Sequence, residues 1–592
     1  MLQQFQMKKI IFLFLITFFV FIQKINSQTF EETKKLAEHG DVDAQYNIGI
    51  CYYEGKGIIK DHKEAVKWFE KAAEQGSKEA QFVLGLCYYN GEGVLKDYKE
   101  AVACFTKGAE QGFAEAQFEL GLHYYNGEGV LRDYKEAVVW FTKAADQGNA
   151  DAQYNLGVCY HNGIGVLTDY KEAVKWYTKA GDQGNEDAQF GLGICYHYGK
   201  GVLKDYKEAV RWYTKSAEQG NAFAQYCLGL CYNEGKGVIK DYEEAVKWYT
   251  KAAEQGNVYA QYELGVCYLK KDSVFSDYKE AVKWIEKAVE QGNIGAQYNF
   301  GLCYYNGWGV PIDYKEAVKW YTKAAEQGNI KAQSCLGLCY YEGKGVIKDY
   351  KEAIKWYTKA AEQGDANAQF ELGVCYLKEE INDYTEAITW IKKAAEQGNV
   401  EAQSYLGLCY NEGKGVIKDY NVAITWYTKA AEQGNAEAQY ELGACYLKGD
   451  INDYTEAIKW IEKAAEQGNV KAQNNLGLCY YEGKGVLKDY KEAVRWYKKA
   501  AKQGDAKAQF NLGVCYYNED FILKDYKEGI RWYEKAAEQG HAEAQYTLGV
   551  CYFNENGVLK DMNKVKHWMK LSYENGYEKA KAFWDKHELW NY

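Results

Sequence analysis

Apolar residues recur along most of this chain with the spacing of an α-helix, and glycines interrupt them at regular intervals. One stretch shows the pattern clearly, with apolar or small residues at Ala332, Cys335, Leu336, Cys339 and Tyr340. These positions correspond to i, i+3, i+4, i+7 and i+8, which lie on one face of a helix. The pattern therefore predicts an amphipathic first helix that starts near Ala332.

The residues that follow predict a turn and a second helix. Gly343 and Gly345 end the first helix and turn the chain. Asp349 precedes Glu352 by three residues, which predicts an N-cap with a capping-box partner. The second apolar face consists of Ala353, Trp356, Tyr357 and Ala360.

Together these signals predict an antiparallel helical hairpin. Gly364 ends the second helix, and Asp365 is placed to cap the next first helix. Gly337 and Ala353 are small residues at the positions where the two helices would cross, so the helices can approach closely. One hairpin cannot bury both of its apolar faces, so neighbouring hairpins must stack on it.

The hairpin recurs along the chain, which predicts an all-α solenoid of stacked two-helix repeats. Successive units are 36 residues apart, except for two steps of 34. Each unit carries an Ala-Gln dipeptide, starting at Ala44, Ala80, Ala116, Ala152, Ala188, Ala224, Ala260, Ala296, Ala332, Ala368, Ala402, Ala438, Ala472, Ala508 and Ala544. Fifteen repeats are expected over residues 44–579, with capping helices in residues 28–43 and 580–592. Residues 332–401 and 402–471 align as two copied blocks of 70 residues.

Composition agrees with a helical array and argues against one class of partner. The chain has 592 residues, 47% hydrophobic and 16% aromatic, and a single proline, Pro311. So few prolines suit continuous helices. The net charge of −11 is spread along the chain, whereas nucleic-acid binding calls for a clustered basic surface. No nucleic-acid partner is therefore expected.

The first residues differ from the rest and predict export. Lys8 and Lys9 precede an apolar run over residues 10–22, which is too short to span a bilayer but fits a secretory signal peptide. Residues 1–27 are expected to form that signal peptide, with cleavage near Ser27. An uncleaved membrane anchor is the alternative. The chain has no Asn-x-Ser/Thr sequon, which favours a bacterial source and a periplasmic or secreted location.

The repeat resembles a known family. Its consensus is Ala-Gln-x-x-Leu-Gly-x-x-Tyr-x-x-Gly-x-Gly-Val, then Asp-Tyr-x-x-Ala-x-x-Trp-Tyr-x-Lys-Ala-Ala-x-x-Gly, and it covers about residues 30–592. This pattern resembles the Sel-one-like repeats of the tetratricopeptide-like superfamily. The resemblance implies a right-handed superhelix of antiparallel two-helix repeats that binds proteins or peptides on its concave surface.

Cysteine and histidine positions give no sign of site chemistry. Fourteen of the 17 cysteines precede the repeat tyrosine. Equivalent helices of neighbouring units pack roughly 8–10 Å apart, whereas a disulfide needs Cα atoms within about 6.8 Å. We therefore expect buried packing residues. The eight histidines are scattered, and no catalytic set or zinc motif accompanies them. No catalytic residue, cofactor or metal is predicted.

Two other functions remain open through the resemblance. Some cysteine-rich bacterial members staple each repeat with a disulfide and have been proposed to act on β-lactams. This chain has Ala361 and Ala368 at the bridging positions, which weakens that alternative. Other relatives are endoplasmic-reticulum quality-control adaptors, but this chain lacks sequons and a C-terminal apolar segment.

The resemblance places the first helices on the concave surface, where two aromatic rows are candidates for protein binding. The first row comprises Tyr46, Phe82, Phe118, Tyr154, Phe190, Tyr226, Tyr262, Tyr298, Phe370, Tyr440, Phe510 and Tyr546. Packing between units is an equally open interpretation of that row. The predicted protein-binding residues are Tyr53, Tyr89, Tyr125, His161, His197, Tyr305 and Tyr341, together with Trp308, an isolated aromatic expected to be exposed in its loop.

Overall fold

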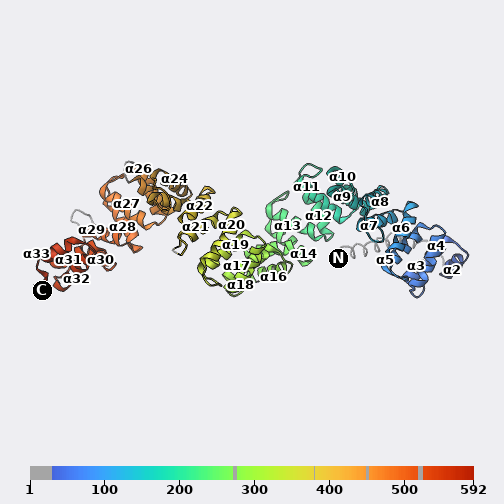
Figure 1. Cartoon of the computed structure of the whole chain (residues 1–592), viewed down its shortest axis with the longest axis horizontal. Helices are drawn as coiled ribbons and strands as arrows, with labels where there is room; N and C mark the ends of the chain where they lie inside the picture. Colours follow the sequence, from blue (N-terminus) through green and yellow to red (C-terminus); the bar gives the residue numbers. More distant parts are fainter. Residues whose placement is uncertain (1–29, 271–275, 379, 448–452, 518–524, 592) are drawn as a thin grey trace. The chain divides into compact units, whose positions relative to one another are not determined.

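The computed structural model describes residues 30–270, 276–378, 380–447, 453–517 and 525–591. Within these ranges the regular elements are all helices, as predicted (Figure 1). The signal peptide expected in residues 1–27 lies outside the described residues. No described helix has both the length and the apolar character that crossing a bilayer requires.

The chain divides into two compact units, one ending at Ala296 and the other starting at Gln297. The first unit contains α2 (Phe30–Glu38), α3 (Val42–Glu54), α4 (His62–Glu74), α5 (Lys78–Asn90), α6 (Tyr98–Glu110), α7 (Ala114–Asn126), α8 (Tyr134–Asp146), α9 (Ala150–Asn162), α10 (Tyr170–Asp182), α11 (Glu186–Tyr198), α12 (Tyr206–Glu218), α13 (Ala222–Glu234), α14 (Tyr242–Glu254), α15 (Val258–Leu269) and α16 (Tyr278–Glu290).

The division falls inside α17 (Ile294–Asn306). The second unit continues with α18 (Tyr314–Glu326), α19 (Ile330–Glu342), α20 (Tyr350–Glu362), α21 (Ala366–Tyr376), α22 (Tyr384–Glu396), α23 (Val400–Glu412), α24 (Tyr420–Glu432), α25 (Ala436–Tyr446), α26 (Tyr454–Glu466), α27 (Val470–Glu482), α28 (Tyr490–Lys502), α29 (Ala506–Tyr517), α30 (Tyr526–Glu538), α31 (Ala542–Asn554), α32 (Met562–Glu574), α33 (Glu578–Lys586) and the 3₁₀ helix η1 (Leu589–Asn591).

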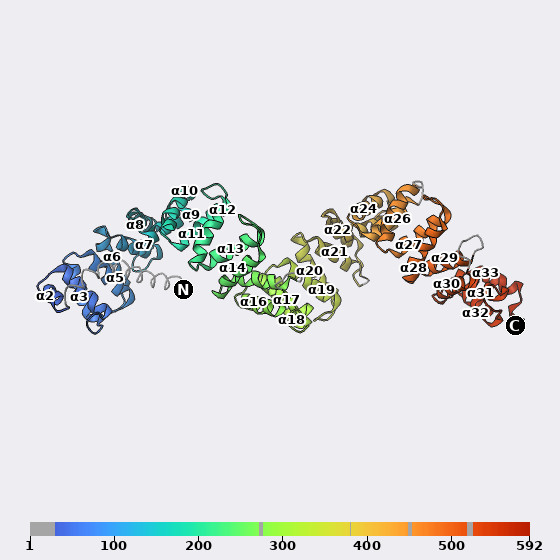
Figure 2. The ribbon, with the colours of Figure 1, turned by 180° about the vertical axis from the view of Figure 1, so that it is seen from behind.

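From α3 onwards, odd-numbered helices are first helices and even-numbered helices are second helices of a hairpin. The first helices from α5 to α15 and from α19 to α31 each contact the second helix of their own repeat and the second helix of the repeat before it. Figure 2 shows this alternation from behind, for example where α19 lies beside α20. At the N-terminal end α2 covers α3, with the rings of Phe30 and Tyr52 5.8 Å apart.

Capping residues fix where most helices begin and end, as the sequence predicts, although α7 and α33 have no side-chain N-cap bond. Asp349 accepts hydrogen bonds from the backbone N–H groups of Lys351 (2.8 Å) and Glu352 (3.1 Å) at the start of α20. Gly343 ends α19 with φ of 77°, a left-handed conformation that glycine adopts without strain. Asp365 accepts from the N–H of Ala368 at 2.6 Å and so caps α21.

The capping box expected at Glu352 is wrong. The Glu352 carboxylate pairs with Nζ of Lys355 at 3.0 Å on the exposed face of α20. The backbone N–H of Asp349, which a capping box would satisfy, instead donates to the carbonyl of Tyr340 at 3.0 Å. That bond closes the loop between the two helices, so Glu352 has no donor left to reach.

Close approach within the hairpin depends on glycine, as predicted, but the partner is an aromatic ring. A Cβ atom at Gly337 would lie 2.8 Å from Cδ1 of Tyr357, closer than two carbon atoms can pack. Tyr357 therefore lies directly on the backbone of α19. It belongs to a core cluster with Ala361 of α20 and Leu372 of α21, so this core lies between one repeat and the next.

A buried glutamine joins three successive helices. Gln333 of α19 is 4% exposed, and its Nε2 donates to the carbonyl of Ala325 in α18 at 3.1 Å. Its Oε1 accepts from Nε2 of Gln363, which follows α20, at 2.8 Å. The same bond to the preceding second helix is made by Gln45, Gln81, Gln117, Gln153, Gln189, Gln225, Gln261, Gln369, Gln403, Gln439, Gln473, Gln509 and Gln545.

We predict that Gln333→Leu destabilises its repeat although it keeps the side-chain volume. The substitution removes two hydrogen bonds, the one from Gln333 to the carbonyl of Ala325 and the one from Gln363 to Gln333, and their loss costs on the order of 1–3 kcal/mol. The carbonyl of Ala325 keeps only the backbone N–H of Gly328, at 3.1 Å. Hydrogen exchange of α18–α20 is the suitable measurement, because a repeat array opens locally. Lys355→Ala is the control, since it removes an exposed ion pair, worth about 0–1 kcal/mol, and a contact with the ring of Trp356 at 5.7 Å, but no buried hydrogen bond. Equal exchange rates in the two variants would contradict a structural role for the glutamine.

Candidate protein-binding surface

The seven ring positions predicted at the ends of first helices are half-buried rather than exposed. Each contacts the first residue of the second helix in its own repeat. Ring centroids are 4.7–5.4 Å apart in the pairs Tyr53–His62, Tyr89–Tyr98, Tyr125–Tyr134, His161–Tyr170, His197–Tyr206, Tyr305–Tyr314 and Tyr341–Tyr350. These ring contacts therefore pack the end of each first helix against the start of its second helix.

Polar side chains from the following repeat contact these ring pairs. The hydroxyl of Tyr53 donates to the carboxylate of Glu92, which lies between the two loop glycines of the next repeat. At the equivalent loop position, Nζ of Lys344 donates to the hydroxyl of Tyr305 at 3.1 Å. The predicted residues therefore lie at contacts between successive repeats. The structure does not bring them together in one site.

The burial of Trp308 and of Phe82 can be compared with the predictions from sequence. Trp308 was expected to be exposed, but it is half-buried, and its backbone N–H donates to the carbonyl of Cys303 at 2.9 Å. In the first row, Phe82 is completely buried, and its ring centroid lies 5.9 Å from that of Phe105 in α6 and 5.5 Å from that of Phe113, the N-cap residue of α7. Phe82 therefore packs in the core, as the second interpretation of that row expected, whereas most other members of the row are half-buried.

A different row of apolar side chains is fully exposed, and the sequence reasoning missed it. Most long loops carry a leucine or isoleucine just after a valine or isoleucine, as in Gly-Val-Leu-Lys-Asp, and Pro311 takes that position in one loop. Ten such side chains are 87–92% exposed: Ile59, Leu95, Leu131, Leu167, Leu203, Ile239, Ile347, Ile417, Leu487 and Leu559. The available signal was an apolar residue that recurs outside both helical faces.

A cavity of about 260 Å³ opens on the first helices α23 and α25. Ser404 lies there at the position that an aromatic residue of the first row occupies in most repeats. The other residues that line the cavity are Glu401, Tyr405 and Leu408 of α23, Tyr427 of α24, Asn435, and Glu437 and Glu441 of α25. Sequence reasoning missed these residues, although Ser404 interrupts the aromatic row.

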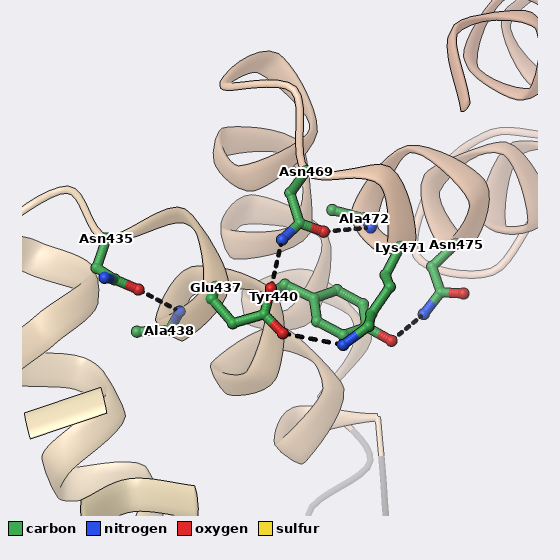
Figure 3. Close-up of polar contacts among 8 residues, drawn as sticks. All are labelled: Asn435, Glu437, Ala438, Tyr440, Asn469, Lys471, Ala472 and Asn475. Atoms are coloured by element: carbon green, nitrogen blue, oxygen red, sulfur yellow. Dashed lines mark hydrogen bonds and ion pairs between the residues drawn. The ribbon is translucent and has the colours of Figure 1, made fainter. Parts of the chain in front are cut away.

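Hydrogen bonds to the next repeat hold one wall of this cavity in place (Figure 3). The two carboxylate oxygens of Glu437 accept from Nδ2 of Asn469 at 2.8 Å and from Nζ of Lys471 at 3.0 Å. The bond to Glu437 raises the pKa of Lys471. Beside them, the hydroxyl of Tyr440 accepts from Nδ2 of Asn475 at 3.2 Å. The Glu437 side chain is therefore oriented by two fixed donors.

The repeat starting at Ala116 contains two buried titratable groups on α7. Glu119 is 6% exposed, its Oε1 has no partner in the described part of the chain, and burial, with smaller contributions from Asp151 and Glu128, raises its pKa to about 7. His123 replaces the repeat cysteine, and burial lowers its pKa. Its Nδ1 lies 2.7 Å from the carbonyl oxygen of Glu128. His123 is therefore largely neutral near neutral pH, whereas Glu119 changes from protonated to ionised around pH 7.

Burial also governs the cysteines. Thirteen of the fourteen cysteines at the repeat position are buried, and Cys51 is half-buried. Burial raises the pKa of Cys159 to about 12 and that of Cys195 to about 11. The prediction that these are packing residues is confirmed. Their thiols stay protonated at neutral pH, which disfavours them as nucleophiles.

The fold and the repeated hairpins define a helical-repeat solenoid, a class whose extended surfaces suggest an interaction scaffold. The Sel1 repeat model matches fifteen consecutive segments between residues 42 and 577. The chain belongs to the Sel1 repeat family.

One solved structure, c5321, shows the same architecture. The chain is 33% identical to c5321, a protective antigen of uropathogenic Escherichia coli with an SLR fold, covering 88% of this chain and 97% of that one with a TM-score of 0.59. It is 35% identical to a Sel1 repeat protein from Oxalobacter formigenes, covering 53% of this chain and 91% of that one, with a TM-score of 0.42. No curated protein matches the chain.

We predict that Glu119→Gln removes a pH-dependent loss of stability. The folded carboxyl titrates at about 7 and the ordinary carboxyl at 4.5. Between these pH values the folded state keeps a proton that the unfolded state has released, so stability falls as pH rises. At about 1.4 kcal/mol per pH unit, the variant should be more stable than the parent at pH 8 by on the order of 3 kcal/mol.

Hydrogen exchange of α7 at pH 5 and pH 8, corrected for the intrinsic exchange rate, measures this difference. Glu110→Gln on the exposed end of α6 is the control and should behave as the parent does at both pH values. A gain for Glu119→Gln that is the same at both pH values would show that burial does not shift the titration of Glu119.

Proposed function

We propose that this chain is an exported, non-catalytic scaffold that binds protein partners along the row of exposed loop leucines and isoleucines. The observation that carries the proposal is the near-complete exposure of ten aliphatic side chains at one repeat position. Scattered apolar residues on a surface need no explanation, but an apolar residue that recurs at one edge of successive repeats forms an extended contact row.

The size of the expected interaction follows from the side chains. Burying one exposed leucine or isoleucine against a partner contributes about 1.5–3 kcal/mol. A single loop therefore binds weakly, because association has its own entropic cost. Several loops that contact one extended partner act together, and their combined affinity far exceeds that of one loop. Such a surface suits a long or repetitive protein partner.

We predict that replacing Leu95, Leu131, Leu167 and Leu203 together by serine abolishes partner capture and leaves the fold intact. These side chains are 90–92% exposed, so their loss removes little packing. The measurement is crosslinked capture from the native compartment, with circular dichroism and thermal melting as checks on folding.

The matched control replaces Lys99, Lys135, Lys171 and Lys207 by serine, four exposed residues in the same repeats. It should capture the same partners as the parent chain. If the leucine variant captures as much partner as the parent chain, the exposed loop residues do not take part in binding. If the parent captures no protein, the proposed scaffold function is wrong.

The alternatives have less support. A β-lactam-handling role would need a reactive group, whereas burial raises the pKa of the repeat cysteines. An endoplasmic-reticulum adaptor would be eukaryotic, whereas both relatives compared above come from bacteria. Export is supported by the charged and apolar pattern of residues 8–22. The description of the Escherichia coli relative as a protective antigen also supports it.

We predict that Leu15→Arg blocks export, because a charge in the middle of the apolar run prevents its insertion. Mass spectrometry of the exported parent should find a new N-terminus near Gln28, while the variant keeps its full length in the cytoplasm. A full-length parent in the membrane fraction would instead establish the uncleaved anchor. Export of the variant would show that residues 10–22 are not the signal.

A further inference from the structure

Two aromatic side chains on the first helices α13 and α15 are exposed where most repeats carry a charge. Phe223 is 53% exposed and Tyr259 is 52% exposed. Each lies one residue before the Ala-Gln dipeptide of its repeat. Eleven of the other thirteen repeats have Asp, Glu or Lys at this position, and the two exceptions are Gly295 and Asn367. An exposed ring in place of a solvated charge is a departure that packing within the repeat does not require.

The two exposed rings belong to a continuous strip of aromatic side chains. The ring of Phe223 packs against that of Phe190 in α11, with centroids 6.2 Å apart and planes at 35°. Tyr226 lies three residues after Phe223, on the same face of α13. Its ring packs against that of Tyr259 at 5.8 Å and 31°. We call these four residues the aromatic strip; it crosses three successive first helices of the first compact unit.

The charges close to the aromatic strip are compensated. Burial is the main cause that raises the pKa of Tyr226, and the carboxylates of Glu263 and Glu234 add to this effect. Each of these carboxylates is near a lysine. Lys270 opposes the rise that burial causes in the pKa of Glu263, and Nζ of Lys236 lies 2.6 Å from the carboxylate of Glu234. The strip therefore offers aromatic faces without a net charge to attract a charged ligand.

The exposed area fits a short peptide better than a folded subunit. A phenylalanine or tyrosine side chain has an area of about 150–250 Å². The exposed halves of Phe223 and Tyr259 therefore present roughly 200 Å² in total. A stable interface between folded chains buries about 800 Å² on each partner. A second copy of this chain would need to find most of its contact area elsewhere, whereas a narrow extended peptide contacts little besides the rings.

A polyproline II segment matches the strip in period and in hydrogen bonding. It has about three residues per turn and rises about 3.1 Å per residue, so every third side chain lies on one edge, about 9 Å apart. Equivalent helices of neighbouring repeats pack roughly 8–10 Å apart. Successive prolines on that edge can therefore meet successive repeats. The segment makes no internal hydrogen bonds, so its carbonyls are free to accept from the hydroxyl of Tyr259.

We propose that the aromatic strip binds an uncharged, proline-rich segment of a partner protein in the polyproline II conformation. Prolines three residues apart lie on Phe223 and Tyr259, and a stiff segment loses little conformational entropy when it binds. This chain has a single proline, Pro311, so the segment belongs to another protein. The proposal rests on the scaffold function above and specifies the chemistry of one partner segment.

The test compares two peptides that differ only in the spacing of their prolines. One is fluorescein-labelled (Pro-Ala-Ala)₄, and the other has the same composition with prolines alternately two and four residues apart. Both are titrated with the mature chain, and fluorescence polarisation is recorded. The peptide with prolines at every third residue should bind at least five times more tightly, because only its prolines share one edge. Equal binding of the two peptides overturns the proposal.

Variants at the repeat position locate the site. Phe223→Asp and Tyr259→Asp each install the residue that Asp151 provides at this position, so both should fold as the parent does. Each should weaken binding of the periodic peptide about tenfold. Lys507→Asp is the matched control, because it changes the same exposed position in a repeat outside the strip, and it should bind as the parent does. Melting curves check the fold of all three variants.

The remaining outcomes count against the proposal. An equal loss of binding in Lys507→Asp and Tyr259→Asp would show that the peptide does not bind at the strip. Tighter binding of a helix-forming peptide with leucine at every seventh residue would assign the strip to a helical partner. Sedimentation equilibrium tests a second copy of the chain as the occupant, and self-association that Tyr259→Asp abolishes would establish it.

The outcome is separable from that of the proposed function. A chain that captures partners through its loops but does not distinguish the two peptides keeps the scaffold function, and the proposal for the aromatic strip is wrong. A chain that prefers the periodic peptide but captures partners equally well without its loop leucines keeps the strip as a binding site, and the proposed role of the loops is wrong.

Discussion

The buried glutamine of each repeat is the interaction on which the rest of the structure depends. Apolar packing holds the hairpins together without direction, whereas the amide of Gln333 has to face the carbonyl of Ala325 and Nε2 of Gln363 at the same time. A helix that slides or rotates by one residue loses both bonds and leaves polar groups buried without partners. The amide therefore fixes the register of three helices. Because the same bonds recur along the described chain, the paired helices keep the same register from one repeat to the next.

The elements of the fold could be predicted from sequence because their signals are local. Helical periodicity, the loop glycines and the aspartate caps act within a few residues, and the structure confirms them at Gly343, Asp349 and Asp365. The capping box failed because its donor bonds to Tyr340, a contact that closes a loop. The role of the glutamine was also beyond a local signal, since both of its partners lie on other helices.

The candidate surfaces were harder to predict, because exposure in a stack is decided by the following repeat. Tyr53 and Tyr305 lie at the end of a helix and would be open in a single hairpin, but residues Glu92 and Lys344 of the next repeat contact them. The loop leucines are not covered in this way and remain exposed. Ser404 could be read from the sequence as a gap in the aromatic row, but the acidic walls of its cavity come from two successive repeats.

The glutamine bonds also bear on how such a chain changes in evolution. A deletion or duplication of one whole repeat places a second helix beside a first helix of the same kind. The new pair of helices can then form the same amide hydrogen bonds as the original pair. The aligned blocks 332–401 and 402–471 each hold two repeats, and Gln333 and Gln403 make equivalent bonds in both. Recombination between near-identical repeats can thus alter the number of repeats without disrupting the packing between neighbouring repeats. The number of contact loops is then free to follow the length of whatever is bound.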